Sequence, residues 1–180
     1  MWYVIQVLSG QEQKAADLIT RTVAEAQAQA GDGRPTQVLR ECFVPKYQVE
    51  RKFHGEYRVL ERNLFPGYVI AVSTNVGELN QLLRGVHAFT RILGNEKSFV
   101  PLDRAEMQFV DSFTSEKQRV IRLSKAVAEG DAVTVVEGPM KGHEAWIKKI
   151  NRRKGTAHVE MSMFGRTVSV EIGLAVVTKA

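Results

Sequence analysis

The spacing of apolar residues changes after about residue 113. Before that point, strand-like runs such as residues 2–8 and 68–72 alternate with stretches in which apolar residues recur every three or four positions. From Val127 onward the chain consists of short β-branched runs separated by glycine turns, for example at Gly155 and Gly165. Because a change from helical to strand spacing accompanies a polar, basic stretch, we expect two domains joined by a linker.

The first 113 residues predict the order strand, helix, strand, hairpin, strand, helix, strand, helix. Helix starts are indicated by two capping-box patterns and by a hydrophobic staple around a third N-cap: Ser9 with Glu12, Asn75 with Glu78, and Leu102 with Met107 around Asp103 and Glu106. This order is typical of an α+β fold, a split βαβ sandwich with helices over a mostly antiparallel sheet. We place the domains at 1–113 and 127–180, with a linker at 114–126 and a small closed β-barrel as the second domain.

The segment NLFPGYVIAV, residues 63–72, is a strand-like run interrupted by Pro66 and Gly67. Phe65 and Tyr68 flank the interruption. One interpretation is a shallow apolar concavity that receives the tip of a partner helix. The other is that Phe65 and Tyr68 are ordinary core residues and that Pro66 and Gly67 form a turn.

Composition excludes several classes of function. The single cysteine, Cys42, rules out an intrachain disulfide, and the four histidines are not spaced as metal ligands, so we expect no metal and no cofactor. No window reaches the roughly 20 apolar residues of a membrane span, and the first residues do not resemble a signal peptide, so we expect a cytoplasmic protein without a membrane partner. Glu160, Glu171, His158 and Ser162 form no recognised catalytic signature, and we assign no enzymatic activity.

The densest positive region is KKINRRKG, residues 148–155. The net charge of +5 indicates a polyanionic partner only because cations cluster in this region, where they can contact phosphates. The candidate RNA-binding residues are Lys148, Lys149, Arg152, Arg153 and Lys154, with Lys141 and His143 from an earlier turn. The alternative is a solvated basic hairpin without a ligand. We expect Trp146 to be a core strand residue, which leaves no aromatic platform and favours a structured RNA over a single strand.

The motif order WYVIQV, FVP, LFPGYV, EGDAVTVVEGPMKG and SMFGRTVSVE resembles the NusG family of transcription elongation factors over essentially the whole chain. The resemblance implies an N-terminal NGN domain and a C-terminal KOW domain with an SH3-like β-barrel. It also implies that the NGN domain binds the clamp helices of the largest RNA polymerase subunit. The residues that we assign to this contact are Tyr3, Phe65, Pro66, Gly67 and Tyr68.

The segments KYQVERKFHGEY and TRILGNEKSFVPLDRAEM are similar to the specialised LoaP branch of the family. Lys46 and Leu64 also differ from the residues usual in housekeeping members. This similarity implies processive antitermination, with the KOW domain on a nascent RNA hairpin. We expect a monomer. The alternative is a housekeeping factor whose KOW domain binds Rho or a small-subunit ribosomal protein through Met163, Phe164 and Arg166.

Overall fold

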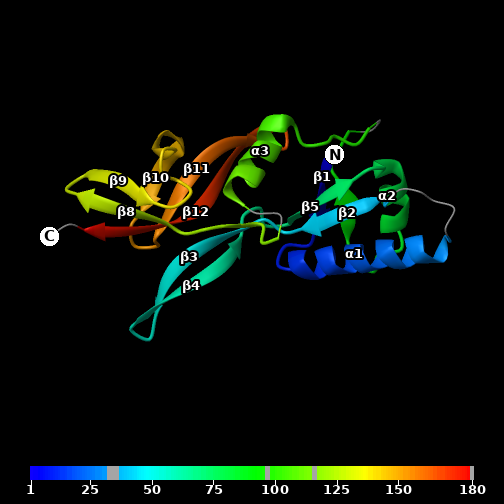
Figure 1. Cartoon of the computed structure of the whole chain (residues 1–180), viewed down its shortest axis with the longest axis horizontal. Helices are drawn as coiled ribbons and strands as arrows, with labels where there is room; N and C mark the ends of the chain where they lie inside the picture. The colour runs from blue at the N-terminus through cyan, green and yellow to red at the C-terminus, as the bar shows by residue number, and fades with distance from the viewer. Residues whose placement is uncertain (32–36, 96–97, 115–116, 179–180) are drawn as a thin grey trace. The chain divides into compact units, whose positions relative to one another are not determined.

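The polypeptide contributes two separate segments to each of two compact units. The computed structural model describes residues 1–31, 37–95, 98–114 and 117–178. Unit 1 contains Met1–Val44 and Phe65–Met107, and unit 2 contains Pro45–Leu64 and Gln108–Ala180 (Figure 1). The boundary between the units falls within helix α3 (Arg104–Phe113).

Unit 1 is built on a four-stranded antiparallel sheet with the strand order β2-β5-β1-β6. Its strands are β1 (Trp2–Val7), β2 (Leu39–Phe43), β5 (Tyr68–Ser73) and β6 (Thr90–Ile92). Helices α1 (Glu12–Gln29) and α2 (Val76–Leu83) cover one face. Because side chains alternate across a strand, Tyr3, Ile5 and Val7 all point to that face and pack in one core with Ile19 and Leu79.

Two of the three predicted helix starts are confirmed. The Asn75 side chain accepts a hydrogen bond from the Glu78 amide at 3.1 Å. Asp103 and Glu106 form a reciprocal capping box, with side-chain to backbone distances of 2.8 and 2.7 Å. The predicted pair of Ser9 and Glu12 is wrong.

Helix α1 begins at Glu12, and Gln11 occupies its N-cap without a side-chain hydrogen bond to the helix. Gly10, with a φ of 85°, separates Ser9 from the helix start. Ser9 therefore lies outside the cap, and the Glu12 carboxylate has another role, described below.

Unit 2 contains a curled five-stranded sheet with the order β10-β11-β12-β8-β9, in which β12 and β8 are parallel and the other neighbours antiparallel. Its strands are β8 (Ser124–Glu129), β9 (Ala132–Glu137), β10 (Ile147–Asn151), β11 (Thr156–Met163) and β12 (Arg166–Thr178). A 3-10 helix, η1 (Glu144–Trp146), comes immediately before β10 and contains Trp146, which the sequence predicts to be a strand residue.

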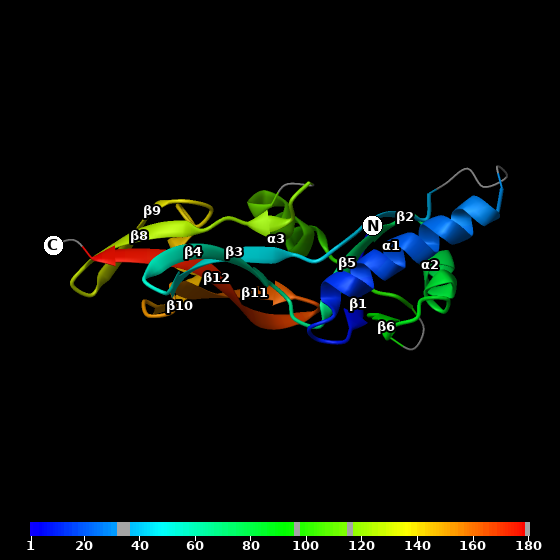
Figure 2. The same ribbon diagram turned by 90° about the horizontal axis from the view of Figure 1, so that it is seen from below.

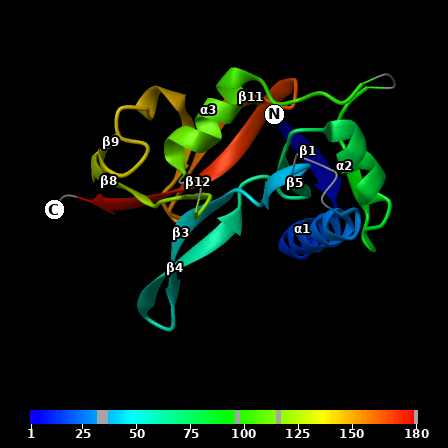
Figure 3. The same ribbon diagram turned by 45° about the vertical axis from the view of Figure 1, so that its right-hand side comes forward.

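The predicted hairpin is formed by β3 (Lys46–Phe53) and β4 (Glu56–Asn63) and belongs to unit 2. His54 and Gly55 connect the strands with φ values of 50° and 90°, as a type I′ turn requires. Strand β3 runs beside β12 (Figure 2), and the tip extends away from the curled sheet (Figure 3).

The range 114–126, which the sequence predicts as a linker, contains β7 (Val120–Ile121) and the start of β8. Residues 115–116 of this range lie outside the described residues. Strand β7 pairs with β3, in the three-stranded order β4-β3-β7. The compact units thus differ in extent from the predicted domains, and independent folding of residues 1–113 and 127–180 stays a prediction.

Candidate functional site

The interruption in NLFPGYVIAV is a tight turn before β5. The Tyr68 amide donates to the Phe65 carbonyl at 3.1 Å, Pro66 is exposed, and Gly67 has a φ of 85°. Proline followed by a residue of positive φ is typical of a type II turn. A Cβ atom at Gly67 would meet only the Val7 carbonyl, at 3.8 Å. The glycine is therefore required by the backbone conformation rather than by lack of space.

A buried glutamate of α1 holds this turn in place. The Gly67 amide donates to Glu12 Oε1 at 2.7 Å, and Glu12 is only 2% exposed. The Gly67 carbonyl accepts from the Val7 amide at 2.8 Å, so both backbone groups of Gly67 are bonded. In the sequence, the role of Glu12 is indicated only by its position on the same face of α1 as the buried residues Ala15 and Ile19.

Replacing Glu12 with alanine is expected to destabilise unit 1 by about 1–3 kcal/mol, because the buried Gly67 amide loses its acceptor. Urea unfolding followed by circular dichroism measures the loss. Glu12→Gln keeps an acceptor oxygen and should lose less, and Gln13→Ala on the exposed side of α1 serves as the control. Equal stability of Glu12→Ala and Gln13→Ala would contradict the role of Glu12.

The structure brings four of the five predicted polymerase-contact residues together and separates the fifth. Phe65, Pro66, Gly67 and Tyr68 form the turn, with Phe65 buried and Tyr68 half-buried. Tyr3 pairs with Ala71, whereas Tyr68 pairs with Gln6, three residues further along β1. Tyr3 and Tyr68 therefore point to opposite faces of the sheet, and Tyr3 lies in the core beneath the helices.

The face of the sheet opposite α1 and α2 is rich in apolar side chains. Tyr68 and Ile70 lie on this face together with Val4, by the alternation along β1 and β5. Val4 and Ile70 are buried, whereas Tyr68 and Trp2 are half-buried. The rings of Trp2 and Phe43 meet edge to face, with centroids 5.5 Å apart. The sequence reasoning missed Trp2 and Phe43, because only the pairing of β1 and β2 with β5 places them beside the residues of the motif.

In unit 2 the predicted cations surround the connection between β10 and β11. We define the basic turn as Lys148, Lys149, Arg152, Arg153 and Lys154, all of which are exposed. A register shift between Ile147 and Lys149 interrupts the pairing of β10, so the two adjacent lysines can both reach solvent. The Lys154 amide donates to Asn151 Oδ1 at 2.9 Å, and Arg152 donates to the Gly130 carbonyl at 3.1 Å.

Lys141 and His143 have other neighbours. The His143 ring lies 4.7 Å from Trp146 and 5.2 Å from Phe113, measured between centroids. Backbone hydrogen bonds, and then the charges of His143 and Lys141, lower the pKa of Glu144. Glu144 thus accompanies Lys141 and His143, whereas in the basic turn the charge of Lys154 acts on Glu171.

Trp146 is not a core strand residue, and that prediction is wrong. It lies in η1 and is 40% exposed. Its ring packs against those of Phe109 and Phe113, at centroid distances of 6.1 and 5.9 Å. The 3-10 turn lifts Trp146 out of the strand, so a buried Trp146 can no longer be used to argue that an aromatic platform is missing.

The alternative docking residues surround the tight turn between β11 and β12. Phe164 and Gly165 have φ values of 57° and 70°, and Met163 pairs with Arg166 across the turn. Met163 is fully buried, Phe164 is half-buried and Arg166 is exposed. Of these three residues, only Phe164 and Arg166 are therefore accessible to a partner.

The hairpin is attached to the curled sheet through Glu171. Tyr47 donates to Glu171 Oε2 at 3.2 Å, and Thr156 donates to Oε1 at 2.7 Å. Burial, followed by the charge of Glu171 and this hydrogen bond, raises the pKa of Tyr47 to about 12. Partial burial opposes ionisation of Glu171, but the hydrogen bonds from Thr156 and Tyr47 lower its pKa on balance. These partners give Glu171 a structural role.

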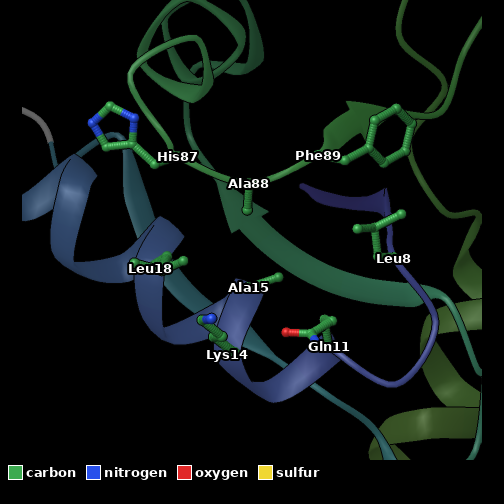
Figure 4. Close-up of a pocket in the computed structure, with 8 residues that line it drawn as sticks. All are labelled: Leu8, Gln11, Lys14, Ala15, Leu18, His87, Ala88 and Phe89. Atoms are coloured by element: carbon green, nitrogen blue, oxygen red, sulfur yellow. The ribbon is translucent and has the colours of Figure 1, made fainter.

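Other candidate sites are less developed. A pocket of about 190 Å³ lies between the start of α1 and residues 87–89 (Figure 4). It is smaller than the roughly 300–1,000 Å³ of most small-molecule sites.

Within the described residues no cluster of three or more His, Cys, Asp or Glu side chains could hold a metal ion. None of the described helices combines the length and the apolar character of a membrane span. Burial raises the pKa of the Cys42 thiol to about 12, which makes it a poor nucleophile.

These two units define a protein that joins a split βαβ sandwich to an SH3-like β-unit. A family described as transcription termination factor NusG matches residues 1–111, and the KOW motif matches residues 129–160. The chain belongs to the NusG family of transcription termination and antitermination factors. The predicted family and fold class are thereby confirmed.

Relatives and a solved structure extend the similarity over the whole chain. The transcription termination/antitermination protein NusG of Pasteurella multocida is 28% identical over 99% of this chain and 94% of its own length. NusG of Thermus thermophilus is 27% identical, over 99% and 98% of the two chains. The structure of Thermotoga maritima NusG, 21% identical, superposes with a TM-score of 0.55 over 97% of this chain and 92% of its own, which supports the fold.

Proposed function

We propose that this protein binds RNA polymerase through unit 1 and promotes read-through of terminators while the basic turn of unit 2 contacts a hairpin in the nascent RNA. The observation that carries the proposal is the basic turn, where five exposed cations gather within seven residues. Long cations at the tip of a small β-sheet can neutralise several phosphates. The similarity to the LoaP branch supports antitermination as the outcome.

The proposed polymerase contact is the exposed turn at Pro66 together with the half-buried side chains of Tyr68 and Trp2. The expected partner is the pair of clamp helices of the largest subunit, which is what the family resemblance implies. Aromatic side chains beside a rigid turn are suited to anchoring a helix. Tyr3 is left out of this surface because it points into the helix-covered core.

Replacing Tyr68 with alanine is expected to weaken binding to purified core polymerase by about 1–4 kcal/mol, the range for a central aromatic anchor. Biolayer interferometry with immobilised polymerase measures the change. Tyr57→Ala, which removes an exposed tyrosine from the hairpin, is the matched control. If both variants bind as the unaltered protein does, with folding verified by circular dichroism, the polymerase contact lies elsewhere.

Terminator read-through by purified polymerase, with and without the protein, tests the function as a whole. The second candidate is a housekeeping coupler whose unit 2 docks on Rho or a small-subunit ribosomal protein. The half-buried Phe164 and exposed Arg166 at the turn between β11 and β12 favour it. Rho-dependent release that increases with the protein, without hairpin RNA binding, would favour this second candidate.

A further inference from the structure

The two faces of the β3–β4 hairpin differ in charge. Strand pairing places Arg51 opposite Arg58, and Lys52 opposite Tyr57. Side chains alternate between the two faces, and on the first face Tyr47 and Val49 are buried. The residues of this face are Tyr47, Val49, Arg51, Phe53, Glu56, Arg58, Leu60 and Arg62, and those of the other are Lys46, Gln48, Glu50, Lys52, Tyr57, Val59, Glu61 and Asn63. The first face has three arginines and one glutamate, whereas the second has two lysines and two glutamates. We call the first of these the arginine face.

The arginine face is on the side of the hairpin that meets the basic turn. Arg51 donates a hydrogen bond to the Lys154 carbonyl. Tyr47, on the same side of β3, bonds to Glu171, and the charges of Arg62 and Arg51 act on its hydroxyl group. The charge of Lys154 in turn acts on Glu171. Cations from two elements about 100 residues apart in the sequence are thus neighbours within unit 2.

Phe53 gives this face an exposed aromatic ring next to cations. It is 55% exposed, and the Arg58 guanidinium carbon lies 5.5 Å from its ring centroid. The His54 ring stands edge to face with it at 4.3 Å. An aromatic ring paired with a guanidinium group is a surface on which an unstacked base can lie.

We propose that the arginine face and the basic turn form one RNA-binding surface, on which stem phosphates contact the cations and one unpaired base stacks on Phe53. The inference rests on the proposed binding of RNA by the basic turn and extends it to the hairpin. Contacts between cations and the phosphates of a paired stem do not distinguish one RNA sequence from another, because side chains cannot read the deep groove of an RNA helix. A stacked base would supply that discrimination.

The charge pattern favours RNA over an acidic protein segment as the occupant. Arginine is suited to phosphate because its fork of donors matches the phosphate oxygens. An acidic peptide would use the same cations but would gain nothing specific from a base-stacking ring. Removing the Phe53 ring should therefore weaken binding of RNA but not of an acidic peptide.

The test is fluorescence anisotropy of the full chain with two labelled RNA probes. One is a hairpin whose stem carries a single unpaired adenine, and the other is the same stem fully paired. We expect tighter binding of the first probe. Phe53→Ala should weaken binding of that probe by about 5- to 100-fold, as loss of one stacked base does, and leave the paired stem nearly unchanged. Phe53→Tyr should restore most of the affinity.

Tyr57→Ala is the matched control, since Tyr57 is 67% exposed but lies on the opposite face of the same hairpin. Its affinity for both probes should equal that of the unaltered protein. Equal affinities for the two probes, or no effect of Phe53→Ala, would overturn the role of the hairpin while leaving RNA binding by the basic turn intact. If charge reversal in the basic turn changes neither affinity, the proposed function itself fails.

Discussion

Replacing Gly173 with alanine is expected to destabilise unit 2 by about 3 kcal/mol or more, the upper end of the range for overpacking. Gly173 lies on β12 where β3 crosses closely. A methyl group there would lie 2.9 Å from the Gln48 carbonyl carbon, closer still to its oxygen, and 2.8 Å from Leu123 Cδ1. Because the obstructing atoms belong mainly to the backbone of β3, a side-chain rotation cannot relieve the clash. The hairpin must move away from the sheet.

Urea unfolding of a Trp2→Phe background measures this effect, since Trp146 is then the only tryptophan and reports on unit 2. The matched control is Gly77→Ala in α2, where the nearest atom to a new Cβ is 3.6 Å away. Because Gly77 lies in unit 1, that change should leave the unfolding transition reported by Trp146 unaltered. Unaltered stability of Gly173→Ala would mean that β3 and β12 are not held together in solution.

The consequences for RNA binding follow from the same geometry. Separation of β3 from β12 removes the bond from Tyr47 to Glu171 and that from Arg51 to Lys154. The arginine face would then no longer be fixed beside the basic turn. Gly173→Ala should therefore reduce the preference for the RNA with an unpaired adenine, even under conditions where unit 2 remains folded.

Elements with a local cause could be predicted from the sequence. The caps at Asn75 and Asp103 need only residues three positions apart, and both formed as expected. The hairpin turn is signalled by Gly55, and the strands of unit 2 by their glycine spacing. The order of motifs also identified the family, because several separated matches in one order rarely arise by chance.

Features that depend on distant parts of the chain could not be predicted. Glu12 and Gly67 are 55 residues apart, and their hydrogen bond exists only because β1 pairs with β5. The need for glycine at position 173 arises from the close approach of the β3 backbone, which the sequence around Gly173 does not reveal. The packing of the hairpin against β12 had the same cause, since Tyr47 and its partner Glu171 lie more than 100 residues apart in the chain.

The candidate site was predicted in part. The five cations of the basic turn are exposed together, as the run from Lys148 to Lys154 indicated. Tyr3 could not be separated from Tyr68 without the strand register, which places them on opposite faces. Trp146 was misassigned because an apolar neighbourhood in the sequence does not reveal a 3-10 turn.

Reversing three charges of the basic turn, Arg152→Glu, Arg153→Glu and Lys154→Glu, is expected to lower affinity for a hairpin RNA by about 100-fold or more at physiological salt. Each lost phosphate contact should also reduce the magnitude of the log-log salt slope by about one. Anisotropy titrations at several salt concentrations give both quantities. The arginine face would retain residual binding, so the slope should fall without reaching zero.

The matched control reverses three exposed cations of unit 1, with the substitutions Lys14→Glu, Arg21→Glu and Arg40→Glu. It changes the net charge equally but leaves the basic turn unaltered, so it separates a local contact from a general loss of attraction to RNA. Terminator read-through should fall with the basic-turn variant and persist with the control, while polymerase binding is retained by the basic-turn variant. If the basic-turn variant loses RNA affinity but supports full read-through, RNA contact is not the means of antitermination. A protein contact at Phe164 and Arg166 would then be the better explanation.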